Sequence, residues 1–454
     1  MIKHTQHYKN IRPMYVDLTP QPGEKRLLME HVQVPNIHTL PVYESKGGYQ
    51  ALKKVLESKM DRETLIKEVQ GSAVRGRGGA GFPTGNKWNF VPKNTDKPHY
   101  LLCNADESEP GTFKDRVILE HLPHMMIEGM IIGSYAIQAA RSYVYIRGEY
   151  TYATEIVDRA IQEAYKAGYL GKNILGSGFD HEMVVHRGAG AYICGEETGL
   201  ISSLEGKKGW PKLKPPFPAV EGYLRCPTVV NNVETLACVP WIINHGAEAY
   251  AKIGTPKSTG TKMWSVSGDV TRPGVYEVEN GIPFKDFLEK VCGGMKGGRK
   301  LKALIPGGSS APIMTAEEAM SCTLDYESIA SKGSMLGSGG MVVLDDSRDL
   351  VQVLKNLAEF YREESCGQCT PCREGTGWLE KILHSFTERQ ARREDLQLLK
   401  TTSQNMIGRT ICVLADSIAM PVLSYLEKFP GEFENYLQGS SNTSSMSGRV
   451  KHNG

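Results

Sequence analysis

The sequence lacks the features that mark exported, membrane-spanning or nucleic-acid-binding proteins. Its 53 Lys and Arg residues nearly balance 51 Asp and Glu, leaving a formal net charge of +2, so there is no charge excess to bind nucleic acid. Ten cysteines in 454 residues are too few for a secreted disulfide scaffold. The most apolar run, residues 125–140, contains Glu128 and is too short to cross a membrane. The polar first ten residues do not resemble a signal peptide. We therefore expect a protein of a reducing compartment.

Glycine, in contrast, is abundant. It accounts for 48 of 454 residues, about 11% against a usual level of about 7%. Because glycine permits positive φ and close approach of the backbone to a ligand, this favours a cofactor-binding protein. With 40% hydrophobic residues, the length is sufficient for roughly three domains, each with its own core.

Strand-like and helix-like segments alternate in the first half of the chain. Two short helices, 49–57 and 61–69, precede them, with Asp61 as the expected N-cap of the second. The alternation between residues 100 and 244 predicts an α/β fold with a largely parallel sheet. The expected strands are 100–103, 143–147 and 183–186, and the expected helices are 121–140, 152–167 and one after Gly195.

The second half of the chain changes character twice. A stretch rich in Gly, Pro, Ser and Thr, residues 254–260, is typical of a linker. Strands 262–266 and 275–278, a helix at 283–291 and a strand at 301–305 then predict a small grasp-type domain. Beyond residue 345 the pattern predicts a helical bundle. Its expected helices are 350–364, 378–388, 394–405 and 416–427.

The strongest local motif consists of Cys366, Cys369 and Cys372, followed by Cys412. Three cysteines at this spacing fit a tight turn or helix start and can hold three corners of a cubane, with the distant fourth cysteine closing it. A structural zinc site and inert buried thiols are the alternatives, but zinc sites usually offer two separated ligand pairs. The spacing therefore favours a 4Fe-4S cluster, which the nearby Arg373 would tune.

A glycine-rich segment, residues 76–88, contains a formal GxGxxG pattern. A predicted helix precedes it and Phe82-Pro83 interrupts it, so it does not meet the requirements of a Rossmann turn. Its bare backbone can still receive a flat ring system, and Lys87 can face an anion. A flexible surface loop is the alternative.

Three further turns combine polar residues with strand ends. The turn at 102–111 carries several carboxylates, which are either ligand acceptors or simple solvated acids. The turn at 188–198 opens a helix with acidic residues, which are either ribose acceptors or ordinary capping residues. The turn at 227–235 offers asparagine side chains to phosphate or sugar.

Five motifs in a fixed order give the sequence a family resemblance. GRGGAGFPTGNKW, CNADESEPGTFKDR, GAGAYICGEETGLISSLEG, PTVVNNVET and ESCGQCTPCREGT together resemble the NADH-binding flavoprotein subunit of respiratory complex I over residues 43–436. The resemblance implies a Rossmann-like flavin domain, a ubiquitin-like (SLBB) domain and a C-terminal bundle with an iron-sulfur cluster. The corresponding ranges are an arm with short helices at 1–72, the FMN/NADH domain at 73–253, the SLBB domain at 254–340, the 4Fe-4S bundle at 341–438 and a disordered tail at 439–454.

The resemblance also implies the cofactors and their ligands. FMN would take up hydride from NADH and pass single electrons to the cluster. The implied FMN contacts are Gly76, Gly78, Lys87, Asn104, Asp106, Glu107, Gly195, Glu196, Val230, Asn231 and Asn232. The implied NADH contacts are Gly79, Phe82, Phe90, Glu109, Tyr192, Glu197, Lys214 and Phe217. Cys366, Cys369, Cys372 and Cys412 would hold the cluster. No acid-base residue is implied, with Glu109, Tyr192 and Glu197 acting by positioning.

Partners and location follow from the same resemblance. It implies a thioredoxin-like 2Fe-2S subunit (24 kDa type) and a large iron-sulfur subunit (75 kDa type) in the peripheral arm of complex I, on the cytoplasmic side of a bacterial inner membrane and without a transmembrane segment. The diaphorase subunit of an NAD-linked hydrogenase or formate dehydrogenase shares all these sites, and a zinc-stapled interaction scaffold is a further alternative. The six isolated cysteines are expected to be small core residues. They are Cys103, Cys194, Cys226, Cys238, Cys292 and Cys322.

Overall fold

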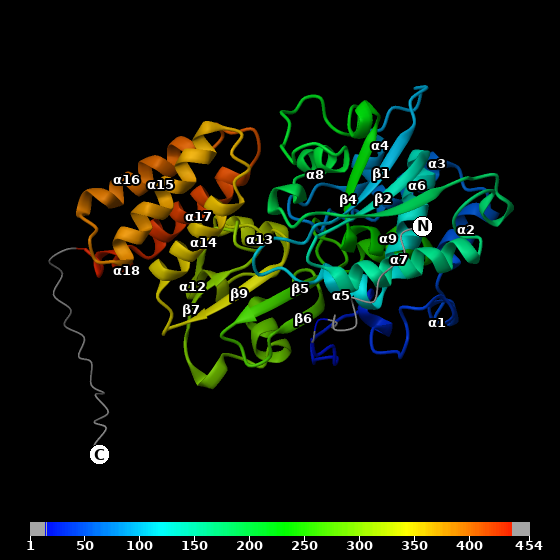
Figure 1. The fold of residues 1–454 in the computed structure, drawn as a ribbon. Coiled ribbons are helices and arrows are strands. Elements are labelled where there is room, and N and C mark those ends of the chain that lie inside the picture. Colours follow the sequence, from blue (N-terminus) through cyan, green and yellow to red (C-terminus); the bar gives the residue numbers. More distant parts are fainter. Residues whose placement is uncertain (1–13, 15, 438–454) are drawn as a thin grey trace, which may run out of the picture. The chain divides into compact units, whose positions relative to one another are not determined.

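The computed structural model describes residue 14 and residues 16–437 (Figure 1). The tail at 439–454 and the beginning of the N-terminal arm lie outside the described residues. The chain forms two compact units, which divide between Asp346 and Ser347.

A four-stranded sheet forms the centre of the first unit. The strands are β1 (His99–Ala105), β2 (Ala139–Ile146), β3 (Glu182–Arg187) and β4 (Thr228–Asn232). They lie in the order β3-β2-β1-β4 and all neighbouring pairs are parallel, which confirms the predicted parallel α/β sheet. β1 and β4 are almost entirely buried, as expected for a parallel strand covered on both faces.

Helices α6 (Pro123–Ile137), α7 (Thr151–Lys166) and α9 (Val233–His245) pack on the sheet, and α6 contacts both of the others (Figure 1). The helix predicted at 121–140 is confirmed as α6, although its first predicted residue belongs to a separate helix, α5 (Asp115–His121), which ends before Pro123. Pro123 stands at the first position of α6, where its fixed φ and missing N–H favour the start of a new helix.

Short helices precede the sheet. They are α1 (Leu40–Ser45), α2 (Gln50–Glu57), α3 (Arg62–Gly71) and α4 (Thr84–Asn89). The Asp61 carboxylate accepts hydrogen bonds from the backbone of Glu63 and Thr64, which confirms the predicted N-cap. Further toward the N-terminus, Met29–His31 form a short 3-10 helix.

A second sheet completes the first unit. Its strands are β5 (Thr261–Gly268), β6 (Gly274–Glu279), β7 (Leu301–Ile305), β8 (Met314–Thr315) and β9 (Gly340–Asp345), in the order β6-β5-β9-β7-β8. The predicted ββαβ order is present, with α11 (Phe284–Asp286) continuing into a π-helical turn, Phe287–Val291. β9 pairs with β5 and β7, so this sheet extends past residue 340, where the sequence placed the end of the domain. Helices α10 (Ala247–Ala251), α12 (Ala316–Met320) and α13 (Tyr326–Ser331) lie before and between these strands.

The N-terminal segment is fixed to this second sheet. The Glu277 carboxylate on β6 is fully buried and accepts hydrogen bonds from the backbone N–H groups of Leu27, Leu28 and Met29. In its described part the N-terminal arm is therefore anchored to β6.

The second unit is a helical bundle, as predicted. It contains α14 (Leu350–Glu364), α15 (Thr370–Thr387), α16 (Arg393–Met406), α17 (Leu414–Lys428) and α18 (Pro430–Glu434). Helix α15 packs against α14, α16 and α17. It begins earlier than the predicted residue 378, because Cys369 is its N-cap residue and Pro371 lies in its first turn.

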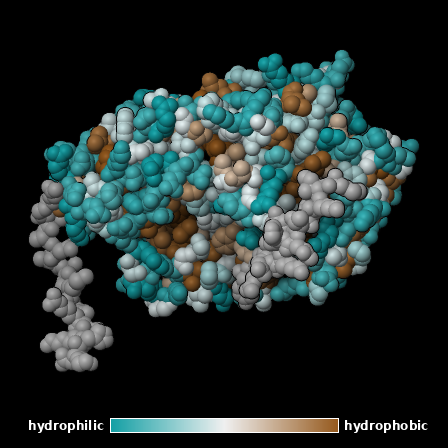
Figure 2. Space-filling model, viewed as in Figure 1, coloured by the Kyte–Doolittle hydropathy of each residue, from teal (hydrophilic) through white to brown (hydrophobic). Residues whose placement is uncertain are grey.

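Apolar side chains fill the cores of both units. On the face drawn in Figure 2, hydrophobic residues form separate patches among hydrophilic ones. Five of the six isolated cysteines are buried as expected, but Cys226 is only half-buried, because it lies in the loop that precedes β4. None of the described helices is both long and apolar enough to cross a membrane.

Candidate functional site

The carboxyl ends of β1 and β4 form the centre of the candidate site. The chain leaves β1 for β2 on one side and returns to β4 on the other side. Asn104 at the end of β1 is paired in register with Asn232 at the end of β4. In open α/β sheets, ligands bind beyond the carboxyl ends of strands where the strand order reverses. The fold therefore places both asparagines at the preferred ligand position.

The glycine-rich loop faces this position. A β-bridge between Arg75 and Pro83 closes the loop, and the N–H of Gly76 donates to Phe82 O at 2.8 Å. A Cβ on Gly78 would lie 3.1 Å from Asn232 Cβ, and Gly79 has a φ of +147°. The loop connects α3 to α4 rather than a strand to a helix, so the inference that it is not a Rossmann turn is confirmed.

Glu197, the first residue of α8 (Glu197–Leu204), lies between two lysines. Its carboxylate is 2.9 Å from Lys87 Nζ and 2.6 Å from Lys214 Nζ. Burial alone would raise the pKa of Glu197, but the two ammonium groups outweigh it and lower the pKa to about 2. The Glu197 carboxylate is therefore ionised at neutral pH and is a hydrogen-bond acceptor of the kind that suits ribose hydroxyls.

The start of α8 is fixed by its own side chains. Glu196 is the N-cap residue and accepts hydrogen bonds from Thr198 N at 2.8 Å and Gly199 N at 2.9 Å. Asn104 Nδ2 donates to Gly195 O at 2.8 Å. Capping is therefore confirmed for Glu196, whose Oε1 atom also lies 3.3 Å from Lys214 Nζ, whereas Glu197 contacts both lysines.

Glu109 is held by two loops. One carboxylate oxygen accepts from the Tyr192 hydroxyl at 2.6 Å, and the other accepts from Ser310 N at 2.7 Å and Ser309 Oγ at 3.2 Å. A Cβ on Gly308 would meet Glu109 Cγ at 2.5 Å. Sequence reasoning missed these serines, although the run Gly-Gly-Ser-Ser at 307–310 is a signal for a close backbone approach.

Three of the residues expected at the site have their side chains committed elsewhere. Glu107 caps α5, since it accepts from Asp115 N at 2.8 Å and Arg116 N at 3.0 Å, and burial together with Asp115 raises its pKa to about 7. Asn231 Oδ1 accepts from Trp88 Nε1 at 2.8 Å, and Val230 is buried in β4. A ligand would therefore meet the backbone of these residues, whereas Asp106 accepts a hydrogen bond from Ser108 at the end of the same turn.

Aromatic side chains are exposed around the site. Phe82 and Phe90 are 47% and 57% exposed, and their ring centroids are 6.0 Å apart. Phe217 is 58% exposed. Exposed aromatic rings of this size are typical of binding surfaces for flat ligands.

These residues fit a flavin. The bare backbone at Gly76, Gly78 and Gly79 leaves space that side chains would fill, as the short Cβ distance at Gly78 shows. Amide groups of Asn104 and Asn232 and the ammonium group of Lys87 suit the polar edge and phosphate of such a cofactor.

The cysteines of the second unit fit an iron-sulfur cluster by their donor chemistry. Cys366, Cys369 and Cys372 surround the start of α15, where the Cys372 thiol lies near the other two. Cys412 lies just before α17, a helix that packs on α15. Among the described residues, no three His, Cys, Asp or Glu side chains converge as ligands of a single metal ion. A cubane instead takes one thiolate at each of four separate iron atoms.

Comparisons with models of known protein families match the regions that contain the glycine loop, part of the second sheet and the four cysteines. The model of the Nuo51 FMN-binding domain matches residues 69–241, the SLBB domain matches residues 263–314, and the NADH-ubiquinone oxidoreductase-F iron-sulfur binding region matches residues 352–436. The last match supports the 4Fe-4S cluster over the zinc alternative.

Similar proteins cover nearly the whole chain. The second F subunit of NADH-quinone oxidoreductase in Rhizobium meliloti is 49% identical over 91% of this chain and 97% of its own length. The NADH-quinone oxidoreductase F subunit of Rickettsia bellii is 48% identical over 88% of this chain and 96% of its own length. A crystal structure of NAD+-reducing [NiFe]-hydrogenase in the air-oxidized state matches with a TM-score of 0.79 and 36% identity, covering 91% of this chain and 67% of that chain.

Fold, site and family models together define an NADH oxidoreductase with FMN and one 4Fe-4S cluster as cofactors. Within this class, nearly half of all aligned residues are identical to those of the two F subunits of NADH-quinone oxidoreductase, and this identity determines the family. The chain belongs to the family of NADH-quinone oxidoreductase F subunits.

Proposed function

We propose that the chain is the electron-input subunit of a complex I, taking hydride from NADH in its first unit and delivering electrons through the cluster of its second unit toward quinone. The observation that carries this proposal is the position of Glu197 and the glycine loop beside the carboxyl ends of β1 and β4. When bound, FMN supplies the chemistry of accepting a hydride and releasing electrons singly.

The protein's own groups act by binding and orientation. Glu197, held ionised by Lys87 and Lys214, accepts hydrogen bonds from the ribose hydroxyls of NADH. Phe82, Phe90 and Phe217 provide apolar faces for the adenine. Hydride transfer requires no proton-transfer residue, so these groups contribute by holding the two rings in reactive geometry.

Glu109 positions the nicotinamide. Its two oxygens are fixed by Tyr192 and Ser310, so the carboxylate cannot turn freely when a ligand enters. A fixed acceptor next to the reacting ring loses little entropy on binding.

The first experiment is an anaerobic absorbance titration of the FMN-containing full chain with NADH and then with NADPH. Bleaching of the flavin band by NADH, and not by NADPH at the same concentration, is the expected result. If neither nucleotide bleaches a flavin that is verified as bound, the proposed function is wrong.

Membership of a family of F subunits supports an assembly with partner subunits. We infer assembly with a thioredoxin-like 2Fe-2S subunit and a large iron-sulfur subunit at the cytoplasmic side of a bacterial inner membrane. The hydrogenase match supports a second candidate, the diaphorase subunit of an NAD-linked hydrogenase. Purification of the native complex discriminates them: quinone-dependent NADH oxidation supports complex I, and hydrogen-dependent reduction of NAD+ supports the hydrogenase.

A further inference from the structure

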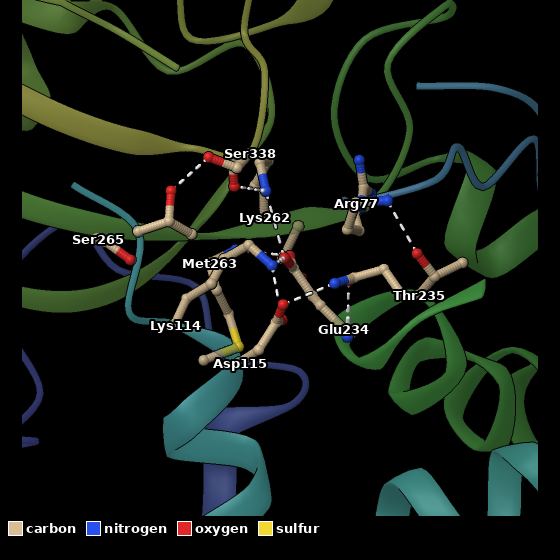
Figure 3. Close-up of polar contacts among 12 residues, drawn as sticks. Arg77, Lys114, Asp115, Glu234, Thr235, Lys262, Met263, Ser265 and Ser338 are labelled. Carbon is tan, nitrogen blue, oxygen red and sulfur yellow. Dashed lines mark hydrogen bonds and ion pairs between the residues drawn. The ribbon is translucent and has the colours of Figure 1, made fainter. Parts of the chain in front are cut away.

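A buried charge cluster lies next to the candidate flavin site. It consists of Arg77, Lys114, Asp115, Glu234 and Lys262, which come from four separate segments of the first unit (Figure 3). Asp115 is 3% exposed and the other four residues are fully buried. Because burial of charges is costly unless they are paired, this cluster requires an explanation beyond packing.

Lys114 is the centre of the cluster. Its Nζ atom lies 2.7 Å from Asp115 Oδ1 and 2.7 Å from Glu234 Oε2. Lys262 Nζ on β5 lies 3.2 Å from the same Glu234 oxygen and donates to Ser338 O at 2.9 Å (Figure 3). Burial would raise the pKa of Glu234, but Lys114, Lys262 and Arg77 lower it to about 2, so this carboxylate remains ionised.

Asn232 is hydrogen-bonded to two residues of the cluster. Asn232 Nδ2 donates to Asp115 Oδ2 at 2.6 Å, and Asn232 Oδ1 accepts from Glu234 N at 2.9 Å. Both ends of the amide are thus oriented by the cluster, and a flip of the amide would break both bonds. Nδ2 carries two hydrogens, so one remains available after the bond to Asp115.

Asn232 also faces the glycine loop, since a Cβ on Gly78 would lie 3.1 Å from its Cβ atom. The glycine loop is also attached to α9, the helix that Asn232 caps, because Arg77 N donates to Thr235 Oγ1 at 2.8 Å (Figure 3). The residues of the cluster are therefore linked both to Asn232 and to the glycine loop.

We propose that Asp115, held in place by Lys114, is a positioning residue that orients Asn232 for FMN. This inference rests on the proposed function, because it requires FMN at the end of β4. Asp115 itself does not touch the cofactor but acts through the Asn232 amide. Lys114 and Asp115 belong to the CNADESEPGTFKDR segment, whose last residues no other part of the site explains.

The test is a double-mutant cycle on the full-length holoenzyme. The variants are Asp115→Asn, Asn232→Ala and the double variant, and the readout is the rate at which FMN leaves the diluted protein, followed by flavin fluorescence. We expect each single variant to release FMN about tenfold faster, the size of a lost hydrogen bond to a charged group. The double variant is expected to be no faster than the faster single variant, because Asp115 acts through Asn232.

Glu277→Gln is the matched control, since Glu277 is an equally buried carboxylate whose bonds lead to the N-terminal segment. It is expected to lower the melting temperature without changing FMN release. If Asp115→Asn does not fold, Lys114→Met, which removes the cation that holds Asp115, takes its place in the cycle with the same expectation.

If the double variant speeds FMN release by the product of the two single-variant factors, the positioning role is overturned, while the proposed function remains intact. Unchanged FMN release in Asp115→Asn would overturn it as well. A wild-type chain that retains no FMN would overturn both the inference and the proposed function.

Discussion

At the scale of single residues, we expect the environment of Glu197 to determine nucleotide selectivity. Lys87 and Lys214 hold its carboxylate ionised, so a 2′-phosphate on the ribose would meet a negative charge at short range. The two lysines partly balance this charge and so reduce the repulsion of a dianionic phosphate. However, the 2′-phosphate replaces the 2′-hydroxyl that would donate a hydrogen bond to the carboxylate.

We predict that Glu197→Gln raises the ratio of kcat/KM for NADPH to kcat/KM for NADH by about tenfold, which is about 1.4 kcal/mol. The amide removes the repulsion and leaves both lysines available to the phosphate. Steady-state kinetics with both nucleotides measures the ratio. Glu221→Gln, which neutralises an exposed carboxylate, should behave as wild type, and an unchanged ratio in Glu197→Gln contradicts the assignment.

At the scale of secondary-structure elements, the sheet contains a histidine that is folded in its neutral form. His181 lies immediately before β3, is 1% exposed, and faces Ala139 O through Nδ1 at 3.1 Å and Ser142 Oγ through Nε2 at 2.8 Å. Burial lowers its pKa from 6.5 to about 4. The unfolded chain therefore binds a proton at a higher pH than the folded chain.

This pKa shift predicts acid sensitivity with a definite sign. The neutral ring stabilises the fold fully above pH 6.5, and the stabilisation is lost as pH falls from 6.5 toward 4, approaching about 3 kcal/mol. Melting temperatures measured across this range should fall less in His181→Gln than in wild type. His245→Gln alters an exposed histidine and should keep the wild-type slope; equal slopes in all three proteins would exclude His181 as the source.

The sequence predicted those elements whose pattern is local. The parallel strands and the bundle follow from apolar runs and helical spacing, but the start of α15 was predicted at residue 378, although Pro371 stands in its first turn. The break between α5 and α6 was missed because apolar residues continue on both sides of Pro123. β8 and β9 were missed because one has only two residues and the other is defined by pairing with strands distant in sequence.

The candidate site shows the same limit. Glycines and acidic turns are visible in the sequence, but the commitment of Asn231 to Trp88 depends on a contact between residues 143 positions apart. The commitment of Glu107 to Asp115 N depends on how the turn between these two residues folds. The buried cluster around Lys114 could not be predicted, because four segments must fold together before its charges are paired.

At the scale of the whole molecule, the two sites belong to different compact units. The glycine loop, both asparagines and Glu197 lie before Asp346, whereas the four cysteines lie after Ser347. Each unit has its own core, so damage to the cysteine site need not disturb the flavin site.

We predict that Cys412→Ser loses iron and acid-labile sulfide but retains NADH-dependent reduction of ferricyanide at the flavin, within about twofold of wild type, since only groups of the first unit serve that step. Metal analysis and the ferricyanide assay provide the two measurements. Cys226→Ser, in the first unit and half-buried, should keep both. Loss of ferricyanide reduction in Cys412→Ser would show that the units are not independent.

The anchoring of the N-terminal segment on Glu277 also bears on how the chain folds during its synthesis. Leu27 and its acceptor are separated by 250 residues. At a translation rate of roughly 5–20 residues per second, roughly 12–50 s pass before the acceptor has been made. During this time Leu28 and Met29, both buried in the finished protein, remain exposed on the nascent chain. The N-terminal segment therefore cannot take its buried position until Glu277 has been made, and until then its apolar residues are accessible to a chaperone at the ribosome.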